Sequence, residues 1–296
     1  MSPSRSRYAT DGPPDYSHRF HAGNVGDVWK HAALVEILRL SGQRPVRYLD
    51  SHAGDGRYPL AATGEWTEGI GRLWGLAADL ARNDPLRLYL DLCRALGGGA
   101  ERPTGYPGSP VLAASMLDDA EFLLWERDAA AHDALAARLG GDSRVRLVRG
   151  DGLAALPEAI AAAEADGEAN VVALVDPPYN EKSDWIAVPD AFAAAARGSS
   201  RACVVLWYPV KSLTRPNAML ARLEESGVEG VAVEILTTSL ESRRNRLNGS
   251  GLILVRPPDG VLRTLAALSP VIGATCATVP GAWSVRMRAF RPPGRA

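Results

Sequence analysis

The sequence has few cysteines and no long apolar run, and both absences narrow its class. Only three cysteines, Cys93, Cys203 and Cys276, occur among the 296 residues. They are too few and too widely spaced for a disulfide framework or a cysteine-type zinc site. No apolar run approaches the roughly 18 residues of a membrane span, and residues 1–15 lack the apolar core of a signal peptide. We therefore expect a cytoplasmic protein without a membrane partner, beginning with a flexible arm over residues 1–15.

An excess of positive charge is also missing. The 33 Lys and Arg residues are balanced by 34 Asp and Glu residues, so the net charge is -1. This balance argues against broad nonspecific binding to nucleic acid, although it leaves room for a local basic face. Four of the five histidines lie in the first 52 residues. Because no metal-ligand spacing such as H-E-x-x-H accompanies them, we expect no metal site.

The N-terminal third is predicted to contain a helix, a strand and an insertion. Asn24 is a suitable N-cap for a helix over residues 24–40. A short strand follows at 45–50 and ends in a glycine-rich turn. Residues 60–105 are rich in Trp, Leu and Arg at helical spacing, so we interpret them as a small helical insertion.

From residue 108 onwards, predicted helices alternate with short strands, which indicates an α/β fold with a mostly parallel sheet and helices on both faces. The nearly all-apolar strands 171–175 and 202–207 fit central positions. The last two strands are expected to form a hairpin with one antiparallel member. We assign residues 16–296 to one domain that carries the insertion. The predicted later strands span 121–126, 145–148, 171–175, 202–207, 230–236 and 251–256.

The strongest chemical signal is Asp176-Pro177-Pro178-Tyr179, directly after a buried strand. In an open α/β sheet, ligands bind outside the carboxyl ends of the strands. Two prolines hold a rigid turn there and leave backbone carbonyls without ladder partners. The Asp176 carboxylate and the Pro177 carbonyl could accept both hydrogens of a planar amine while Tyr179 stacks on the base. The plainer interpretation is an ordinary Asp-Pro turn with a surface tyrosine.

Three other strand ends carry compatible residues. The turn at 49–56 contains Gly54, which lets the backbone approach a ligand closely, although the pattern is not G-x-G-x-x-G. Glu126 ends the next sheet strand and could bind both ribose hydroxyls of a nucleoside. Asp151 follows the third strand and could accept the amine of an adenine ring. Their order along the chain is far more specific than any one of them.

This order resembles the class I S-adenosylmethionine-dependent methyltransferases, whose fold is Rossmann-like, and Asp-Pro-Pro-Tyr is the signature of their amino-methylating branch. Residues 16–31 resemble the opening motif of the ribosomal RNA large subunit methyltransferase J family. Further matches to that family lie at 49–58, 106–110, 206–209 and 249–251.

The resemblance implies S-adenosylmethionine as cofactor and N6 of one adenine in protein-free 23S rRNA as substrate, with the base flipped into the Asp-Pro-Pro-Tyr pocket. It places Asp176 at the catalytic acid/base position and at the cofactor. It also places Tyr16 and His18 in a motif that closes over the site. The other residues that it assigns to cofactor contacts are Lys30, His31, His52, Ser109, Glu126, Asp151 and Gly152.

Several alternatives stay open. The same chemistry could act on DNA adenine, cytosine N4 or a protein glutamine, and a non-catalytic RNA-binding protein could keep the fold. Arg243, Arg244 and Arg246 are either a solvated charge run or, as we prefer, contacts to the RNA backbone. Trp207 is interpreted as a core residue. No interface stripe stands out, so we expect a monomer.

Overall fold

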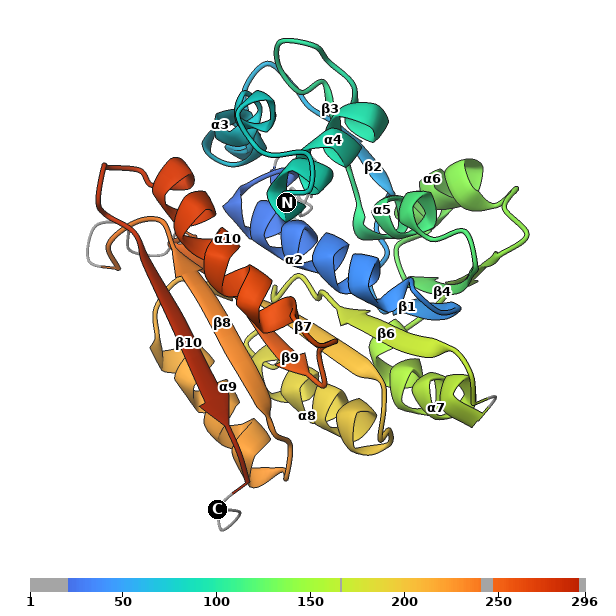
Figure 1. Cartoon of the computed structure of the whole chain (residues 1–296). Coiled ribbons are helices and arrows are strands. Elements are labelled where there is room, and N and C mark those ends of the chain that lie inside the picture. The colour runs from blue at the N-terminus through green and yellow to red at the C-terminus, as the bar shows by residue number, and fades with distance from the viewer. Residues whose placement is uncertain (1–20, 166, 241–246, 293–296) are drawn as a thin grey trace, which may run out of the picture.

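The computed structural model describes residues 21–165, 167–240 and 247–292 (Figure 1). Its strands are β1 (Val46–Asp50), β2 (Arg57–Pro59), β3 (Gly105–Pro107), β4 (Ala120–Glu126), β5 (Val145–Arg149), β6 (Asn170–Val175), β7 (Cys203–Val210), β8 (Gly230–Leu236), β9 (Gly249–Val255) and β10 (Ser284–Phe290). Its α-helices are α2 (Val25–Ser41), α3 (Ile70–Leu73), α4 (Pro85–Gly97), α5 (Ser109–Met116), α6 (Ala129–Leu139), α7 (Gly152–Ala165), α8 (Asp184–Arg197), α9 (Thr214–Glu225) and α10 (Val261–Cys276). Within these ranges, no helix is both long enough and apolar enough to cross a bilayer.

Eight strands form one sheet in the order β10-β8-β9-β7-β6-β1-β4-β5. From β1 the chain builds β4 and β5 on one side, then returns to add β6 and β7 on the other, and these five strands are parallel. The predicted parallel sheet with β6 and β7 in its middle is therefore confirmed. Where the strand order reverses, beside β1, the carboxyl ends of the strands leave a crevice in which ligands bind.

The C-terminal part of the sheet is antiparallel. β9 runs against both β7 and β8, which confirms the expected hairpin. The chain does not end its fold there, because α10 and the edge strand β10 follow, and β10 pairs antiparallel with β8. These two elements were not predicted from the sequence. β10 carries charged residues at Arg286 and Arg288 and is largely exposed, so its pattern lacks the apolar run that identified the central strands.

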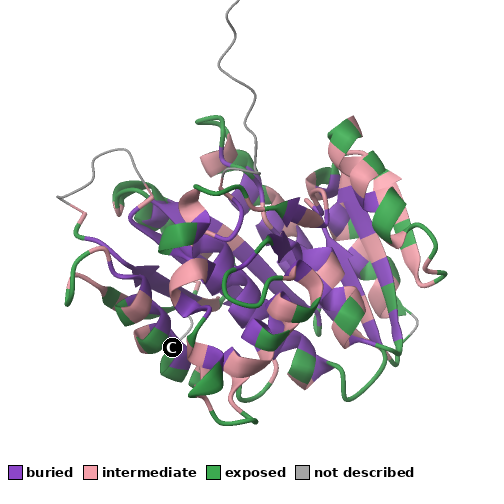
Figure 2. Ribbon diagram, turned by 90° about the horizontal axis from the view of Figure 1, so that it is seen from above, coloured by how far each residue is buried: buried purple, intermediate pink, exposed green. Residues whose placement is uncertain are grey.

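Two apolar layers hold the helices on opposite faces of the sheet. Side chains of α2, α5 and α10 form one cluster with the sheet, and those of α7, α8 and α9 form the other. Figure 2 shows the buried residues along the sheet and the inner sides of the helices, with exposed residues on the outer sides. The expected arrangement with helices on both faces is thus confirmed.

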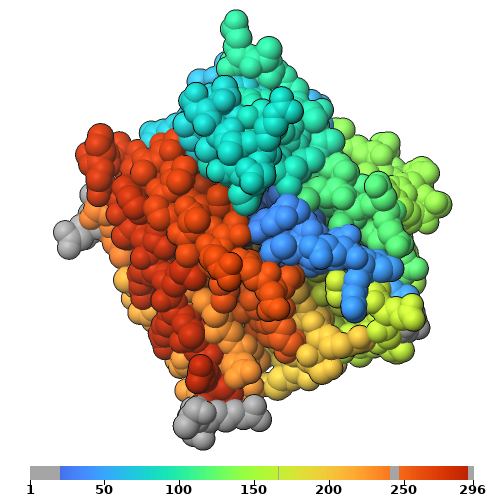
Figure 3. All heavy atoms as spheres, viewed as in Figure 1, coloured from blue at the N-terminus to red at the C-terminus, as the bar shows by residue number. Residues whose placement is uncertain are grey.

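Helix α2 is the most enclosed of these helices. Nearly all of its residues are buried, and among them Arg39 alone is exposed. It packs against β9, α4, α5 and α10, and Figure 3 shows it reaching the surface between the teal insertion and the orange-red α10. The Asn24 side chain accepts a hydrogen bond from the amide of Asp27 at 3.0 Å, which confirms the predicted N-cap.

The segment between β2 and β3 contains α3, α4 and two short 3-10 helices, η1 (Glu65–Glu68) and η2 (Leu76–Ala78). β2 and β3 pair antiparallel beneath these helices, a ribbon that the sequence analysis did not predict. The Arg57 guanidinium donates hydrogen bonds to the carbonyls of Leu96 and Gly97 at the end of α4. The ribbon therefore fixes the helical segment over α2.

Gly251 provides a test of how tightly the central sheet is packed. A Cβ at this position would lie 2.1 Å from Cζ of Tyr208, whose buried hydroxyl donates to Glu234 at 2.9 Å. Because the ring has nowhere to move without breaking that hydrogen bond, we expect Gly251→Ala to lower the free energy of unfolding by about 1–3 kcal/mol. Urea unfolding measures this loss. Gly75→Ala is the control, since a Cβ at Gly75 would meet no neighbouring atom within 4 Å; equal losses in the two variants would contradict the packing argument.

Candidate functional site

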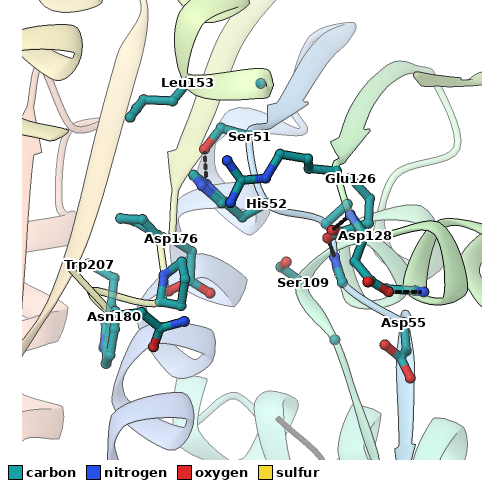
Figure 4. A pocket seen from close by; sticks show the side chains of 18 of the residues that line it. Ser51, His52, Asp55, Ser109, Glu126, Asp128, Leu153, Asp176, Asn180 and Trp207 are labelled. Carbon is teal, nitrogen blue, oxygen red and sulfur yellow. Dashed lines mark hydrogen bonds between the residues drawn. The ribbon is translucent and has the colours of Figure 1, made fainter. Parts of the chain in front are cut away.

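A cavity of about 650 Å³ lies at the carboxyl ends of β1, β4, β5 and β6. Figure 4 shows Asp176, Asn180 and Trp207 toward one end and Glu126 and Asp128 toward the other, with His52 between them. The structure thus brings together residues that the sequence predicted from four separate strand ends. The predicted residues that line the cavity are Lys30, His31, His52, Gly54, Ser109, Glu126, Asp151, Gly152, Asp176 and Pro177.

The Lys30 ammonium links α2 to the loop after β6. Its Nζ lies 2.5 Å from Oδ2 of Asp176 and 2.9 Å from Oδ1 of Asp27, and the lysine side chain is only 4% exposed. Burial alone would lower the pKa of Lys30, but the charges and hydrogen bonds of the two carboxylates outweigh it and raise the pKa. The lysine is therefore a permanent cation that fixes the position of the Asp176 carboxylate.

Trp207 forms part of the wall next to this ion pair. The Lys30 ammonium lies 5.3 Å from the centre of its ring, a cation–π contact. The indole Nε1 donates to Oγ of Ser250 at 2.7 Å. The side chain was interpreted from the sequence as core, but the structure leaves it half-buried with a face on the cavity.

Tyr179 lies in a different place from the one expected. Its ring is buried and packs against Trp185, with ring centres 4.6 Å apart, and it is absent from the lining of the large cavity. Its hydroxyl points to Sδ of Met219 at 3.9 Å. The chain turns sharply at this residue, with φ of 51°, which is uncommon for a side chain of this size. In this structure Tyr179 does not offer a stacking surface to a base in the cavity.

Glu126 organises the opposite end of the cavity. Its Oε2 accepts a hydrogen bond from the amide of Gly54 at 2.8 Å, and its Oε1 accepts one from the amide of Asp128 at 2.7 Å. Gly54 has φ of 63°, and a Cβ there would lie 2.1 Å from the hydroxyl of Tyr58. A glycine is therefore required where the turn approaches Glu126, and the carboxylate is held at the wall with lone pairs left for a ligand.

Asp50 supports the floor of the cavity from beneath. The carboxylate is fully buried and accepts hydrogen bonds from Ser109 Oγ at 2.6 Å, from the Tyr48 hydroxyl at 2.9 Å and from the amide of His52 at 3.1 Å. Burial raises the pKa of Asp50 to about 6, although these hydrogen bonds act against the rise. Asp50 was assigned no role from the sequence, although its place at the end of a predicted strand was the available signal.

The start of α7 forms a third wall of the cavity. Asp151 Oδ1 accepts a hydrogen bond from the amide of Ala154 at 3.1 Å and so caps the first turn of the helix. A Cβ on Gly152 would lie 2.5 Å from the carbonyl oxygen of Ser51 and 2.6 Å from Cβ of Trp125. Only glycine fits this contact, which brings Asp151 to the cavity beside the β1 turn.

Two histidines lie on the remaining wall. Burial lowers the pKa of His52, and its Nδ1 lies 2.8 Å from Oγ of Ser51, so the ring is neutral at neutral pH. The ring of His31 stacks on Tyr106, and its Nδ1 lies 2.8 Å from the Tyr106 hydroxyl. The Tyr106 hydroxyl is in turn 2.9 Å from the hydroxyl of Tyr89 in α4. The buried side chains of His31, Tyr106 and Tyr89 therefore connect the cavity to the insertion.

Sequence reasoning missed a second connection between the insertion and the cavity. Oε2 of Glu65, in η1, accepts a hydrogen bond from Asn24 Nδ2 at 2.9 Å and lies 2.9 Å from Nδ1 of His21. The hydrogen bond to Glu65 raises the pKa of His21. His21, Asn24 and Asp27 all line the cavity. The available signal was their occurrence in the segment 16–31, where Asp27 precedes Lys30 by one helical turn.

Five predicted site residues cannot be placed in this geometry. They are Tyr16, His18, Arg243, Arg244 and Arg246, and they lie outside the described residues, as does the arm at 1–15. Their roles at the site therefore stay predictions.

Comparison with known proteins gives consistent results. Residues 43–289 match the family described as "Ribosomal RNA large subunit methyltransferase D, RlmJ". The "Ribosomal RNA large subunit methyltransferase J" of Escherichia coli (strain K12) is 32% identical over 252 residues, which cover 82% of this chain and 87% of that protein. The protein of the same name from Haemophilus influenzae is 30% identical over 285 residues, which cover 91% and 97%.

A solved structure shows the same fold. The crystal structure of a Legionella pneumophila protein (strain Philadelphia 1) superposes with a TM-score of 0.81 and covers 91% of this chain and 98% of its own, at 24% identity. The family match extends from just before β1 to the last residues of β10 and includes the Glu126, Asp151 and Asp176 ends of the cavity. The chain therefore belongs to the ribosomal RNA large subunit methyltransferase J family and is an enzyme of the methyltransferase class.

Proposed function

We propose that this protein transfers a methyl group from S-adenosylmethionine to N6 of one adenine in 23S rRNA. The observation that carries the proposal is the pair formed by Asp176 and Pro177 at one end of the cavity, fixed by Lys30, with Glu126 at the other end. The names of the two curated relatives support an rRNA of the large subunit as substrate. We further infer that the enzyme acts on protein-free RNA, as a monomer, in the cytoplasm.

The residues of the cavity fit this cofactor. Glu126 stands at the wall with both oxygens fixed by backbone amides, as binding of two vicinal ribose hydroxyls requires. Asp151, at the start of α7, is placed to accept the amine of the cofactor's adenine ring. When bound, the cofactor supplies a methyl group that is already activated by its sulfonium. The protein's main task is then to hold the accepting amine in line with it.

Asp176 and Pro177 would bind that amine. Lys30 occupies Oδ2 of Asp176, so Oδ1 can accept one amine hydrogen while the Pro177 carbonyl accepts the other. These two hydrogen bonds favour a pyramidal nitrogen with a localised lone pair, which is a better nucleophile than a planar adenine amine. As the nitrogen–carbon bond forms and the carbon–sulfur bond breaks, the amine becomes acidic, and the Asp176 carboxylate accepts its proton.

The target base has to leave its stack to reach this point. In the sequence analysis Tyr179 was expected to hold the flipped base, but Trp207 is the aromatic side chain that faces the cavity near Asp176. We therefore assign the stacking contact to Trp207. Tyr16 and His18 are proposed to close over the base, and Arg243, Arg244 and Arg246 to contact the RNA backbone.

The first prediction concerns Asp176. Asp176→Asn keeps the shape of the side chain but removes the proton acceptor, so we expect kcat for methyl transfer to fall roughly 10²–10⁴-fold, while the cofactor Kd changes little. Tritium transfer to 23S rRNA that lacks the modification, with nucleoside mass spectrometry of the product, measures the reaction. Duplex DNA serves as the parallel substrate, and label in DNA alone would overturn the proposed substrate. Wild-type activity in the variant would overturn the mechanism.

The second prediction concerns Lys30. Lys30→Met leaves Asp27 and Asp176 without their shared cation, and removal of one partner of a buried ion pair costs about 3–5 kcal/mol. We expect that loss in the free energy of urea unfolding, and Lys30→Met/Asp27→Asn should recover part of it by removing one of the two charges. Lys182→Met, at an exposed lysine, is the control. A double variant that is less stable than Lys30→Met would contradict the assigned electrostatics.

The third prediction separates the two aromatic residues. Stacking of a base on an aromatic ring contributes about 1–3 kcal/mol, so Trp207→Leu should lower kcat/KM for RNA by roughly tenfold or more, with the cofactor Kd unchanged. Tyr179→Leu should have the smaller effect on kcat/KM once its folded fraction is taken into account. The reverse order of effects would show that Tyr179, and not Trp207, holds the base.

A further inference from the structure

A second, smaller cavity opens on the other side of the Asp-Pro-Pro-Tyr loop. Its volume is about 250 Å³, and it lies between that loop, the end of β7 and the start of α9. We name it the flanking pocket. Its lining residues are Tyr179, Trp185, Pro209, Lys211, Ser212, Arg215 and Pro216.

The flanking pocket has an apolar floor and a cationic rim. Tyr179 and Pro216 are buried beneath it, and Trp185 is half-buried with the Arg215 guanidinium 5.6 Å from its ring centre. Lys211 and Arg215 are exposed, and within the described part of the chain no carboxylate forms an ion pair with either. Two cations beside aromatic and proline surfaces are typical of proteins that bind single-stranded nucleic acid, where phosphates and base faces are contacted together.

The flanking pocket is also adjacent to the larger cavity that Asp176 lines, which we call the catalytic cavity. The ring of Tyr179, in the floor of the flanking pocket, lies 6.2 Å from the ring of Trp207, in the wall of the catalytic cavity. These two aromatic rings therefore separate the two cavities.

We propose that the flanking pocket binds the nucleotide next to the target adenine in the RNA, with its phosphate on Lys211 and Arg215 and its base against Trp185 and the two prolines. This inference rests on the proposed function, because a flipped adenine in the catalytic cavity carries its neighbour along the backbone to this position. It also explains the placement of Tyr179. Tyr179, the last residue of the motif, forms part of the floor of this pocket.

The test compares Lys211→Ala/Arg215→Ala with the wild-type full-length chain on 23S rRNA. We expect KM for RNA to rise roughly tenfold while kcat and the cofactor Kd stay within twofold, because neither residue lines the catalytic cavity. The slope of log(kcat/KM) against log salt concentration should become shallower by about 0.7, since the two cations share one phosphate and each neutralised phosphate of a single strand contributes about 0.7. Arg263→Ala, at an exposed arginine of α10, is the control and should change neither quantity.

A second measurement tests the base contact. Once mass spectrometry has located the methylated adenine, synthetic RNA hairpins carry an abasic residue at its 5′ or 3′ side. We expect one of these substrates to lower kcat/KM of the wild type roughly tenfold, and the same substrate to lower that of Trp185→Ala by less than twofold. The two losses are then not additive, because they remove the same contact.

The outcomes separate this inference from the proposed function. An inactive wild type on 23S rRNA would overturn the proposed function and this inference with it. An active wild type, with KM and salt dependence unchanged in Lys211→Ala/Arg215→Ala, would overturn the flanking pocket alone. Equal losses of kcat/KM from the 5′ and the 3′ abasic substrate, each additive with the loss caused by Trp185→Ala, would likewise overturn the assignment of the base contact to Trp185.

Discussion

The buried ammonium of Lys30 lies between Asp27 and Asp176, and the geometry at the Asp176 end of the cavity depends on this contact. A carboxylate that has to accept an amine hydrogen needs a fixed orientation, and a cation held against one of its oxygens provides it. The same cation holds α2 against the loop after β6 at the wall of the cavity. Because removal of one partner of a buried ion pair is strongly unfavourable, a substitution at any one of the three side chains also affects the other two.

Much of the fold could be predicted from the sequence because its signals were local. Apolar runs such as 171–175 identified the central strands, and the residues that end those strands meet at one edge of the sheet whatever their separation along the chain. For this reason Glu126, Asp151 and Asp176 could be predicted to lie close together, and all three line the cavity. The N-cap at Asn24 was likewise a local signal, since a short polar side chain before an apolar periodic run indicates where a helix begins.

What the sequence did not show depends on long-range contacts. β10 is a largely exposed edge strand in which two arginines interrupt any apolar run, and the β2–β3 ribbon is defined by residues almost 50 positions apart. The direction of the Tyr179 side chain follows from an uncommon backbone angle, which composition does not reveal. Glu65 acts on His21 and Asn24 only because the insertion folds back over α2, and no spacing rule connects them.

The enclosure of α2 has a consequence for synthesis of the chain on the ribosome. This apolar helix is complete at residue 41, but the indole of Trp29 bonds the carbonyl of Val233, and α10 covers the helix only after residue 261. At about 5–20 residues per second, that leaves the side of α2 that contacts α10 uncovered for on the order of ten seconds or more. The side of α2 that faces α10 is therefore exposed to aggregation until the end of the chain has been synthesised, although every residue that lines the cavity, up to Trp207, is already present by then.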